Sequence, residues 1–504
     1  MKQSILKVLL LVLSLCCVAS CAIGCNKNKT QQETNTNQET MEDMLDNKYN
    51  FPETIKLKDN ELNIFNLEQF YNAIVYVDTE DYSDKIPQAV YDRNRSFEEH
   101  YKILIMETKI PFDTRRETTF NNATATLNNL YQAGDDIYDA VYVSLFDQVS
   151  LLTSGYLKDL NTISTLNLTA EWWDPTMTDS YMFNDGKCYV ASSPLHLMSY
   201  ETTYVNFFNP AIVEQRNIED MFALVRSGEW TIEKMLNIIT ESGVVTPNSD
   251  GSFTFDAAGS AVYGMAVHTQ SPFHFLRGMD ISFVNADGTG KYLFRISNND
   301  RFTQVNAMLL RMFDIASGYV VGTDKEDDIA NHPEGYVPIF NAGRSLFLNA
   351  ELKCGMTLKK KLNTEVTYSI LPMPKFDVEQ KSYVSECSNN TLMMAIPVTN
   401  SDAEAAGSAL DTLSYLSYRD VLPRYYNDYI SYRGLNDPNS LEMLNQYIMP
   451  GRCLELGLCY GWTGEFVDKY NAILGGDSTD SLANLYMIYA KDINVAINNF
   501  FNGD

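Results

Sequence analysis

The residues that could carry out covalent chemistry form no familiar catalytic motif in this sequence. The patterns GxSxG, HExxH, GxGxxG and the glycine-rich phosphate loop are missing from its 504 residues. Only five histidines occur, and the nearest pair, His268 and His274, has a six-residue offset that matches neither face of a helix. The residue types therefore predict no metal site, no cofactor and no catalytic centre.

Carboxylates are the one catalytic residue type in surplus, with 65 Asp and Glu in the chain. Two of them could serve as the acid and base of a glycosidase, but the sequence singles out no pair. Covalent chemistry on a glycan therefore stays open as an alternative.

Non-covalent binding of sugars has a different chemical requirement, which this sequence meets well. Aromatic rings stack on the C–H faces of sugar rings, and planar polar side chains bond to the hydroxyls. The chain has 31 Tyr, 25 Phe and 4 Trp, most of which must lie in the core. Because the carboxyl ends of strands in open α/β sheets face the ligand crevice, only residues in those loops are candidate contacts.

Trp462 is the leading candidate for stacking on a sugar. It lies between Gly461 and Gly464, so it is poorly placed for a core helix. A second candidate loop follows the predicted strand 262–267 and contains His268, Gln270 and Phe273.

Further candidate contacts lie at three other places where strands or crossings are predicted. The first three residues of the set below follow the predicted strand 138–143, the next three lie in the crossing between residues 192 and 201, and the last two follow the predicted strand 345–348. The set is Ser144, Asp147, Gln148, His196, Tyr200, Glu201, Asn349 and Glu351.

The elements that must position these residues alternate along the chain. We predict an opening strand region at 61–77, an acidic loop at 78–84, helices at 89–101 and 121–132, and strands at 102–106 and 138–143. Such alternation indicates a mostly parallel sheet with helices on both faces. Trp172, Trp173 and Trp230 are predicted to pack at helix starts, with Thr231 as an N-cap.

Residues 186–209 separate the chain into two parts. Two β-rich runs, 188–191 and 202–208, flank a polar segment in which Ser192, Ser193 and Pro194 suit an extended connection better than a tight hairpin. The segment could be a crossing between two lobes, or a strand, loop and strand within one domain.

The formal net charge of −27 argues against nucleic acid or anionic lipid as a partner. Five cysteines lie beyond the N-terminal region, without close pairs that would indicate zinc or a disulfide framework. Cys453 and Cys459 could pair locally, but we predict free and mostly buried thiols.

The N-terminus has the pattern of a signal peptide over residues 1–20, with Lys2 and Lys7 before an apolar run that is too short to span a bilayer. Residues 18–21, VASC, resemble the lipobox of bacterial lipoproteins, so Cys21 is the expected lipidation site and Cys25 the weaker alternative. Residues 21–50 are predicted to form a disordered tether, since they are polar and poor in aromatic residues.

An ordered set of segments resembles the bacterial extracellular solute-binding proteins of the carbohydrate type, family 1. It includes YDRNRSFEEHYKILI, AGDDIYDAVYV, SGYLKDLN, SGEWTIEKML, FNAGRSLFL and YSILPMPKFDVEQKSY, and it runs from about residue 62 to the C-terminus. The resemblance implies a two-lobed, type II periplasmic-binding-protein-like α/β fold with a multi-crossing hinge. The expected lobes are residues 51–190 with 385–435, and 191–384 with 436–504.

The same resemblance implies a function without covalent chemistry. A monomeric, lipid-anchored receptor on the outer face of the plasma membrane would capture a carbohydrate, in particular an oligosaccharide, by lobe closure. It would hand the ligand to the permease subunits of an ABC importer. The alternatives are a secreted glycan-active enzyme and the same fold with a peptide, polyamine or anion as ligand.

Overall fold

The computed structural model of the protein describes residues 48–67, 85–110, 116–253, 259–296, 300–314, 317–323, 335–355, 368–388, 391–426, 437–476 and 478–502. The chain divides into two compact units, Met1–Asn50 and Phe51–Asp504. The predicted signal peptide and Cys21 lie outside the described residues, as does the tether apart from residues 48–50. Within the described part of the chain, no helix has the length and apolar character needed to cross a membrane.

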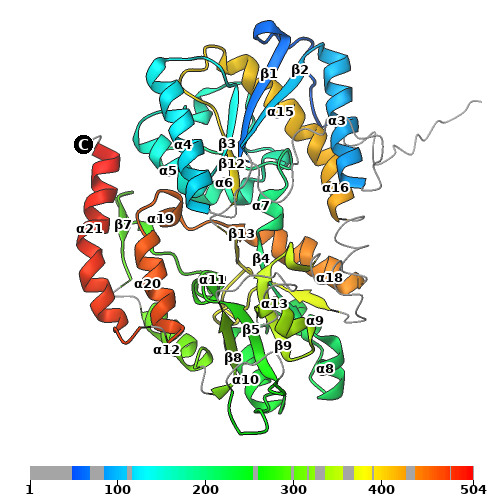
Figure 1. Ribbon diagram of the computed structural model, residues 1–504, viewed down its shortest axis with the longest axis vertical. Coiled ribbons are helices and arrows are strands. Elements are labelled where there is room, and N and C mark those ends of the chain that lie inside the picture. The colour runs from blue at the N-terminus through cyan, green and yellow to red at the C-terminus, as the bar shows by residue number, and fades with distance from the viewer. Residues whose placement is uncertain are drawn as a thin grey trace, which may run out of the picture. The chain divides into compact units, whose positions relative to one another are not determined.

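The first sheet has the strand order β12-β3-β1-β2 (Figure 1). β1 (Glu61–Leu67) pairs in parallel with β2 (Leu104–Ile110) and β3 (Ala140–Ser144), and β12 (Leu392–Ala395) pairs antiparallel with β3. All five residues of β3 are buried, as expected for a strand covered on both faces. The flanking helices are α3 (Lys85–Tyr101), α4 (Arg116–Ala133), α5 (Leu145–Thr153) and α15 (Ala403–Leu416).

The second sheet has the order β10-β4-β9-β5-β8. Its strands are β10 (Ser369–Leu371), β4 (Tyr204–Phe208), β9 (Ser345–Glu351), β5 (Tyr263–His268) and β8 (Val320–Thr323). β5 is parallel to both β8 and β9, whereas β4 is antiparallel to β9 and β10. α13 (Tyr336–Asn341) packs on β5, β8 and β9, and α10 (Ile232–Glu241) packs on β5.

Two short strand pairs and the remaining helices complete the described fold. β6 (Val284–Ala286) and β7 (Tyr292–Phe294) form a hairpin, and β11 (Ser385–Glu386) is parallel to β13 (Arg452–Cys453). The helices are α6 (Pro175–Tyr181), α7 (Met198–Glu201), α8 (Pro210–Gln215), α9 (Met221–Ser227), α11 (Ser271–Gly278), α12 (Asp300–Met312), α16 (Leu422–Arg424), α18 (Pro438–Met443), α19 (Leu456–Cys459), α20 (Gly464–Leu474) and α21 (Leu482–Asn502).

The structure confirms the predicted alternation in the first part of the chain. Strand β1 begins at the predicted residue, and residues 68–84, which include the predicted acidic loop, lie outside the described residues. The two predicted helices correspond to α3 and α4, and the predicted strands to β2 and β3, with ends that differ by a few residues.

The tryptophans predicted to pack at helix starts are all buried. Trp172 and Trp173 donate from their indole nitrogens to the same oxygen, Asp411 Oδ1. Trp230 donates to Pro372 O at 2.9 Å, and the Thr231 hydroxyl accepts a hydrogen bond from Lys234 N at the start of α10. The five cysteines of the described chain are free and buried, as predicted.

Two element boundaries differ from the prediction. Residues 188–191 form no strand, because only Ala191 makes a bridge, to Met394. The segment after it is not extended but turns at Pro194 and enters α7, with His196 N donating to Ser193 O. Serine hydroxyls here bond to one another, Ser192 to Ser199, which stabilises the turn over an extended chain.

The strand predicted at 345–348 continues as β9 to Glu351. Asn349 and Glu351 therefore lie within the strand instead of following it. Asn349 pairs with Asn206 of β4, and its Nδ2 donates to Asn206 Oδ1 at 3.1 Å. The Asn349 amide nitrogen therefore has a partner within the sheet, whereas sequence periodicity alone would place this residue at a strand end.

Candidate ligand-binding site

Polar side chains gather near the carboxyl ends of the parallel strands of the first sheet. Asn66 of β1 is fully buried and pairs in register with Lys109 of β2 and Tyr142 of β3. Asn66 Nδ2 donates to Glu107 Oε1 at 2.6 Å, and Lys109 Nζ lies 3.4 Å from Glu107 Oε2. These side chains can bind hydroxyls or a charged ligand. Apart from their position near strand ends, no sequence signal pointed to them.

His196 is one predicted site residue that the structure brings to this cluster. Its ring stacks on Tyr142 at 5.3 Å, and it is buried. Nδ1 accepts a hydrogen bond from Met198 N, while Nε2 has no hydrogen-bond partner among the described residues. Burial lowers the pKa of His196 to about 3, so the imidazole is neutral at physiological pH.

Tyr200, on α7, makes a packing contact instead of facing open space. The guanidinium carbon of Arg452 lies 4.0 Å from the Tyr200 ring centroid, and Arg452 pairs with the carboxylate of Asp174. All three side chains are buried. The guanidinium of Arg452, on β13, thus contacts a residue of α7 and a residue at the start of α6.

Glu201 and Glu351 come together at the end of β9. Glu351 pairs with Lys353, and Lys353 N donates to Glu201 O at 3.0 Å. Burial raises the pKa of the Glu201 carboxyl to about 8, with the Lys353 ammonium acting against it and Glu351 adding to it. This pair is therefore an acidic, mostly enclosed corner of the second sheet.

The loop after β5 keeps two of its three predicted residues partly accessible. His268 ends β5, accepts a hydrogen bond from Gln270 N at Nδ1, and packs its ring edge-on to Tyr336. Gln270 Oε1 accepts from Asn471 Nδ2 of α20. Phe273, in contrast, is buried against Phe283.

Ser144 is buried as the last residue of β3, paired with Leu392 of β12. Asp147 and Gln148 lie in α5, and their side chains are outside the described part of the structure.

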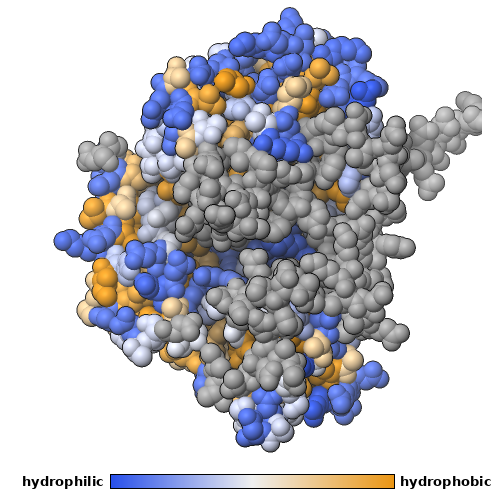
Figure 2. Space-filling model, viewed as in Figure 1, coloured by the Kyte–Doolittle hydropathy of each residue, from blue (hydrophilic) through white to orange (hydrophobic). Residues whose placement is uncertain are grey.

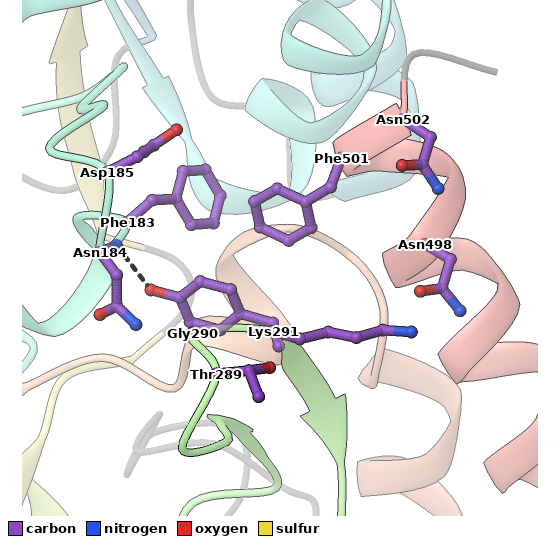
Figure 3. Close-up of a pocket in the computed structure, with 10 residues that line it drawn as sticks. Phe183, Asn184, Asp185, Thr289, Gly290, Lys291, Asn498, Phe501 and Asn502 are labelled. Carbon is purple, nitrogen blue, oxygen red and sulfur yellow. Dashed lines mark hydrogen bonds between the residues drawn. The ribbon is translucent and has the colours of Figure 1, made fainter.

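A pocket of about 420 Å³ lies where three distant chain segments meet (Figure 3). The segments are the turn after α6, the β6–β7 hairpin and the last turn of α21. Its lining comprises Phe183, Asn184, Asp185, Thr289, Gly290, Lys291, Tyr292, Asn498, Phe501 and Asn502. The volume lies within the usual range of small-ligand sites, about 300 to 1,000 Å³.

Trp462 lies next to this pocket, in an aromatic cluster that includes Phe501 of its lining. Its indole stacks on Tyr460 at 5.2 Å and contacts Phe500 and Phe501 of α21 at 5.4 and 6.2 Å. It is half-buried and is not among the lining residues. The glycine before it, Gly461, has φ of +70°, which allows the turn that brings the indole to α21.

No group of three or more His, Cys, Asp or Glu in the described residues could hold a metal ion.

Comparison with known proteins finds similarity in structure but not in sequence. No family model matches the chain, and no curated protein matches it in sequence. Among solved structures, the sugar-binding protein MalE from Xanthomonas citri covers 87% of this chain and 98% of its own, with 11% identity and a TM-score of 0.56. The chain has the fold of a family 1 solute-binding protein.

Two further solved structures share this solute-binding fold. A family 1 extracellular solute-binding protein from Bifidobacterium longum subsp. infantis covers 88% of this chain and 99% of its own, at 13% identity and a TM-score of 0.51. UgpB from Mycobacterium tuberculosis, in complex with glycerophosphocholine, covers 82% and 95%, at 15% identity and a TM-score of 0.51. The predicted two-lobed, type II periplasmic-binding-protein-like fold is confirmed.

Proposed function

We propose that this protein is an extracytoplasmic solute receptor that captures a carbohydrate, in particular an oligosaccharide, between its two lobes and delivers it to an ABC importer. The proposal is carried by the fold shared with a sugar-binding protein over 87% of the chain. It is supported by the polar cluster at the carboxyl ends of the first sheet, the edge at which open α/β sheets bind ligands. The receptor does no covalent chemistry on its ligand.

The proposed lobes are residues 51–190 with 385–435, and 191–384 with 436–504. The pairing of β12 with β3 supports a return of the chain to the first lobe after residue 385. Lipidation of Cys21 and a tether over residues 21–50 would hold the receptor at the outer face of the membrane.

The proposed ligand contacts come from both sheets and from the aromatic cluster. Trp462, His268 and Gln270 are partly accessible and are the first to test. The polar cluster of Asn66 and Glu107 joins the proposed set together with His196, whose Nε2 is free to bond among the described residues.

A calorimetric screen of the purified protein against a panel of oligosaccharides tests the proposed function. We expect saturable binding of at least one glycan with one site per chain and no product formed over hours. Release of products, abolished by substitution of a single carboxylate, would show instead a glycan-active enzyme.

A phosphodiester of glycerol is a second ligand class, favoured by the likeness to a structure that holds glycerophosphocholine. Lys109, beside Glu107 in the first sheet, is a cation that could meet a phosphate. Binding of glycerophosphocholine in the same screen, without binding of any glycan, would select this class over sugars.

A further inference from the structure

The pocket in Figure 3 has an arrangement of rings that leaves one of them accessible. Phe501 is 41% exposed, whereas Tyr292 and Phe183 are 8% and 3% exposed. Tyr292 stacks on Phe501 at 5.2 Å with nearly parallel planes, and Phe183 meets Phe501 edge-on at 4.9 Å. The buried rings therefore hold Phe501 in place as a flat apolar surface.

The segments around these rings are fixed by hydrogen bonds. Tyr292 Oη accepts from Asn184 N at 2.8 Å, the dashed line in Figure 3. In the hairpin turn, Asp287 Oδ1 accepts from Thr289 N, Thr289 Oγ1 and Lys291 N. These bonds order the two turns that line the pocket in this structure, which lowers the entropic cost of ordering them on binding.

Polar groups lie around the ring surface without partners of their own. The side-chain amides of Asn184, Asn498 and Asn502 make no hydrogen bond within the described residues. Asn498 and Asn502 are one helical turn apart at the end of α21 and lie on the same side of Phe501 in Figure 3. Planar amides next to an exposed ring are the groups that recognise sugar hydroxyls and the C–H face of a sugar ring.

The charges of the lining favour a neutral ligand. One carboxylate, Asp185, and one ammonium, Lys291, belong to the pocket. Asp185 also pairs with Lys187 at 3.1 Å, on the exposed side of the turn. A lining with one charge of each sign offers no net field to select an anion or a cation.

We propose that this pocket binds one neutral sugar ring, stacked on Phe501 and hydrogen-bonded by the amides of α21 and of the turn after α6. The lining shares no residue with the polar cluster of the first sheet, and the ring it holds would be one unit of the same bound oligosaccharide. The inference rests on the proposed function, because it assumes a carbohydrate ligand.

Calorimetric titration with maltotriose, cellotriose and xylotriose tests the proposal on four proteins. They are the wild type, Phe501→Ala, the double variant Asn498→Ala/Asn502→Ala, and the control Ile488→Ala. Ile488 lies on the same helix, is 55% exposed and is not part of the pocket. Thermal unfolding of each variant shows that it is folded.

For the trisaccharide that binds the wild type, we expect about tenfold weaker affinity in Phe501→Ala, a loss of threefold or more in the double variant, and no change in Ile488→Ala. The double variant removes one exposed and one half-buried amide, so it reads out binding even if Phe501→Ala unfolds. Wild-type affinity in both pocket variants would overturn this proposal and leave the proposed function standing. Absence of glycan binding by the wild type would overturn both.

Discussion

At the scale of single residues, Arg452 is a buried cation with one aromatic and one anionic partner. It is 1% exposed, its guanidinium lies over the Tyr200 ring, and it pairs with Asp174, itself held at φ of +46°. Burial lowers the pKa of Arg452 to about 9, yet the side chain stays charged at neutral pH. Loss of this buried cation would leave the buried Asp174 carboxylate without its ionic partner.

Replacement of Arg452 by Met should therefore lower the free energy of unfolding by about 3 to 5 kcal/mol, since the Asp174 carboxylate loses its partner. Urea unfolding followed by circular dichroism measures this change. The matched control is Arg226→Met, which breaks the more exposed ion pair with Glu442 and should cost less than about 1 kcal/mol. Equal effects of the two substitutions would contradict the argument.

Glu201 adds a pH dependence at the same scale. Its folded pKa of about 8 lies above the usual 4.5, because of burial. A raised carboxyl pKa means that the folded state holds the proton more tightly than the unfolded state. The stabilisation is then fully present below pH 4.5 and is lost as pH rises through about 8.

In Glu201→Gln, this part of the pH dependence should disappear. Between pH 5 and 8, the free energy of unfolding of the wild type should fall by on the order of 3 kcal/mol more than that of the variant. Urea titrations at the two pH values give the comparison. Parallel pH profiles for the wild type and Glu201→Gln would show that Glu201 does not titrate as described. The control is Glu219→Gln, which replaces an exposed glutamate.

At the scale of elements, the short pair β11–β13 holds a buried ionic cluster. Arg277 of α11 bonds to Glu386 Oε2 at 2.9 Å and lies 3.6 Å from Glu455 Oε2. Glu455 Oε1 accepts hydrogen bonds from Phe283 N and Val284 N, before and in β6. The pair thereby joins α11, β6 and the C-terminal segment into one packed region.

Gly451 is required for this pairing, because a Cβ on it would lie 2.1 Å from Tyr383 O, just before β11. We expect Gly451→Ala to lower the free energy of unfolding by about 1 to 3 kcal/mol through forced separation of the strands. Gly288→Ala, where a Cβ meets nothing within 4 Å, should change it by less than about 0.5 kcal/mol. Denaturant midpoints of the two variants distinguish this steric cause from a general cost of alanine.

At the scale of the whole molecule, the proposed function depends on a change of lobe angle. A ligand shifts that equilibrium only if it binds the closed form more tightly than the open form. On the surface of α21, Met487, Ile488 and Val495 are exposed, and hydrophobic residues are visible along the left edge of Figure 2.

We therefore expect saturating glycan to reduce the radius of gyration in small-angle scattering, while a sugar that does not bind leaves it unchanged. Crystal structures with and without ligand should differ in backbone angles near Ser192 to Pro194, where a hinge crossing is proposed. Identical angles in the two forms would refute that hinge.

The sequence by itself determined the α/β class, because alternating apolar periods depend on local spacing that can be read directly, whereas the two-lobed form was implied by the resemblance to family 1 solute-binding proteins. It also predicted that Trp230 is buried and that the cysteines are free. Only the tertiary structure decided which polar groups meet. Asn66 and Glu107 lie on neighbouring strands and come together through register, and Phe501 reaches Phe183 across more than 300 residues. Such contacts depend on packing between distant segments, which no local pattern encodes.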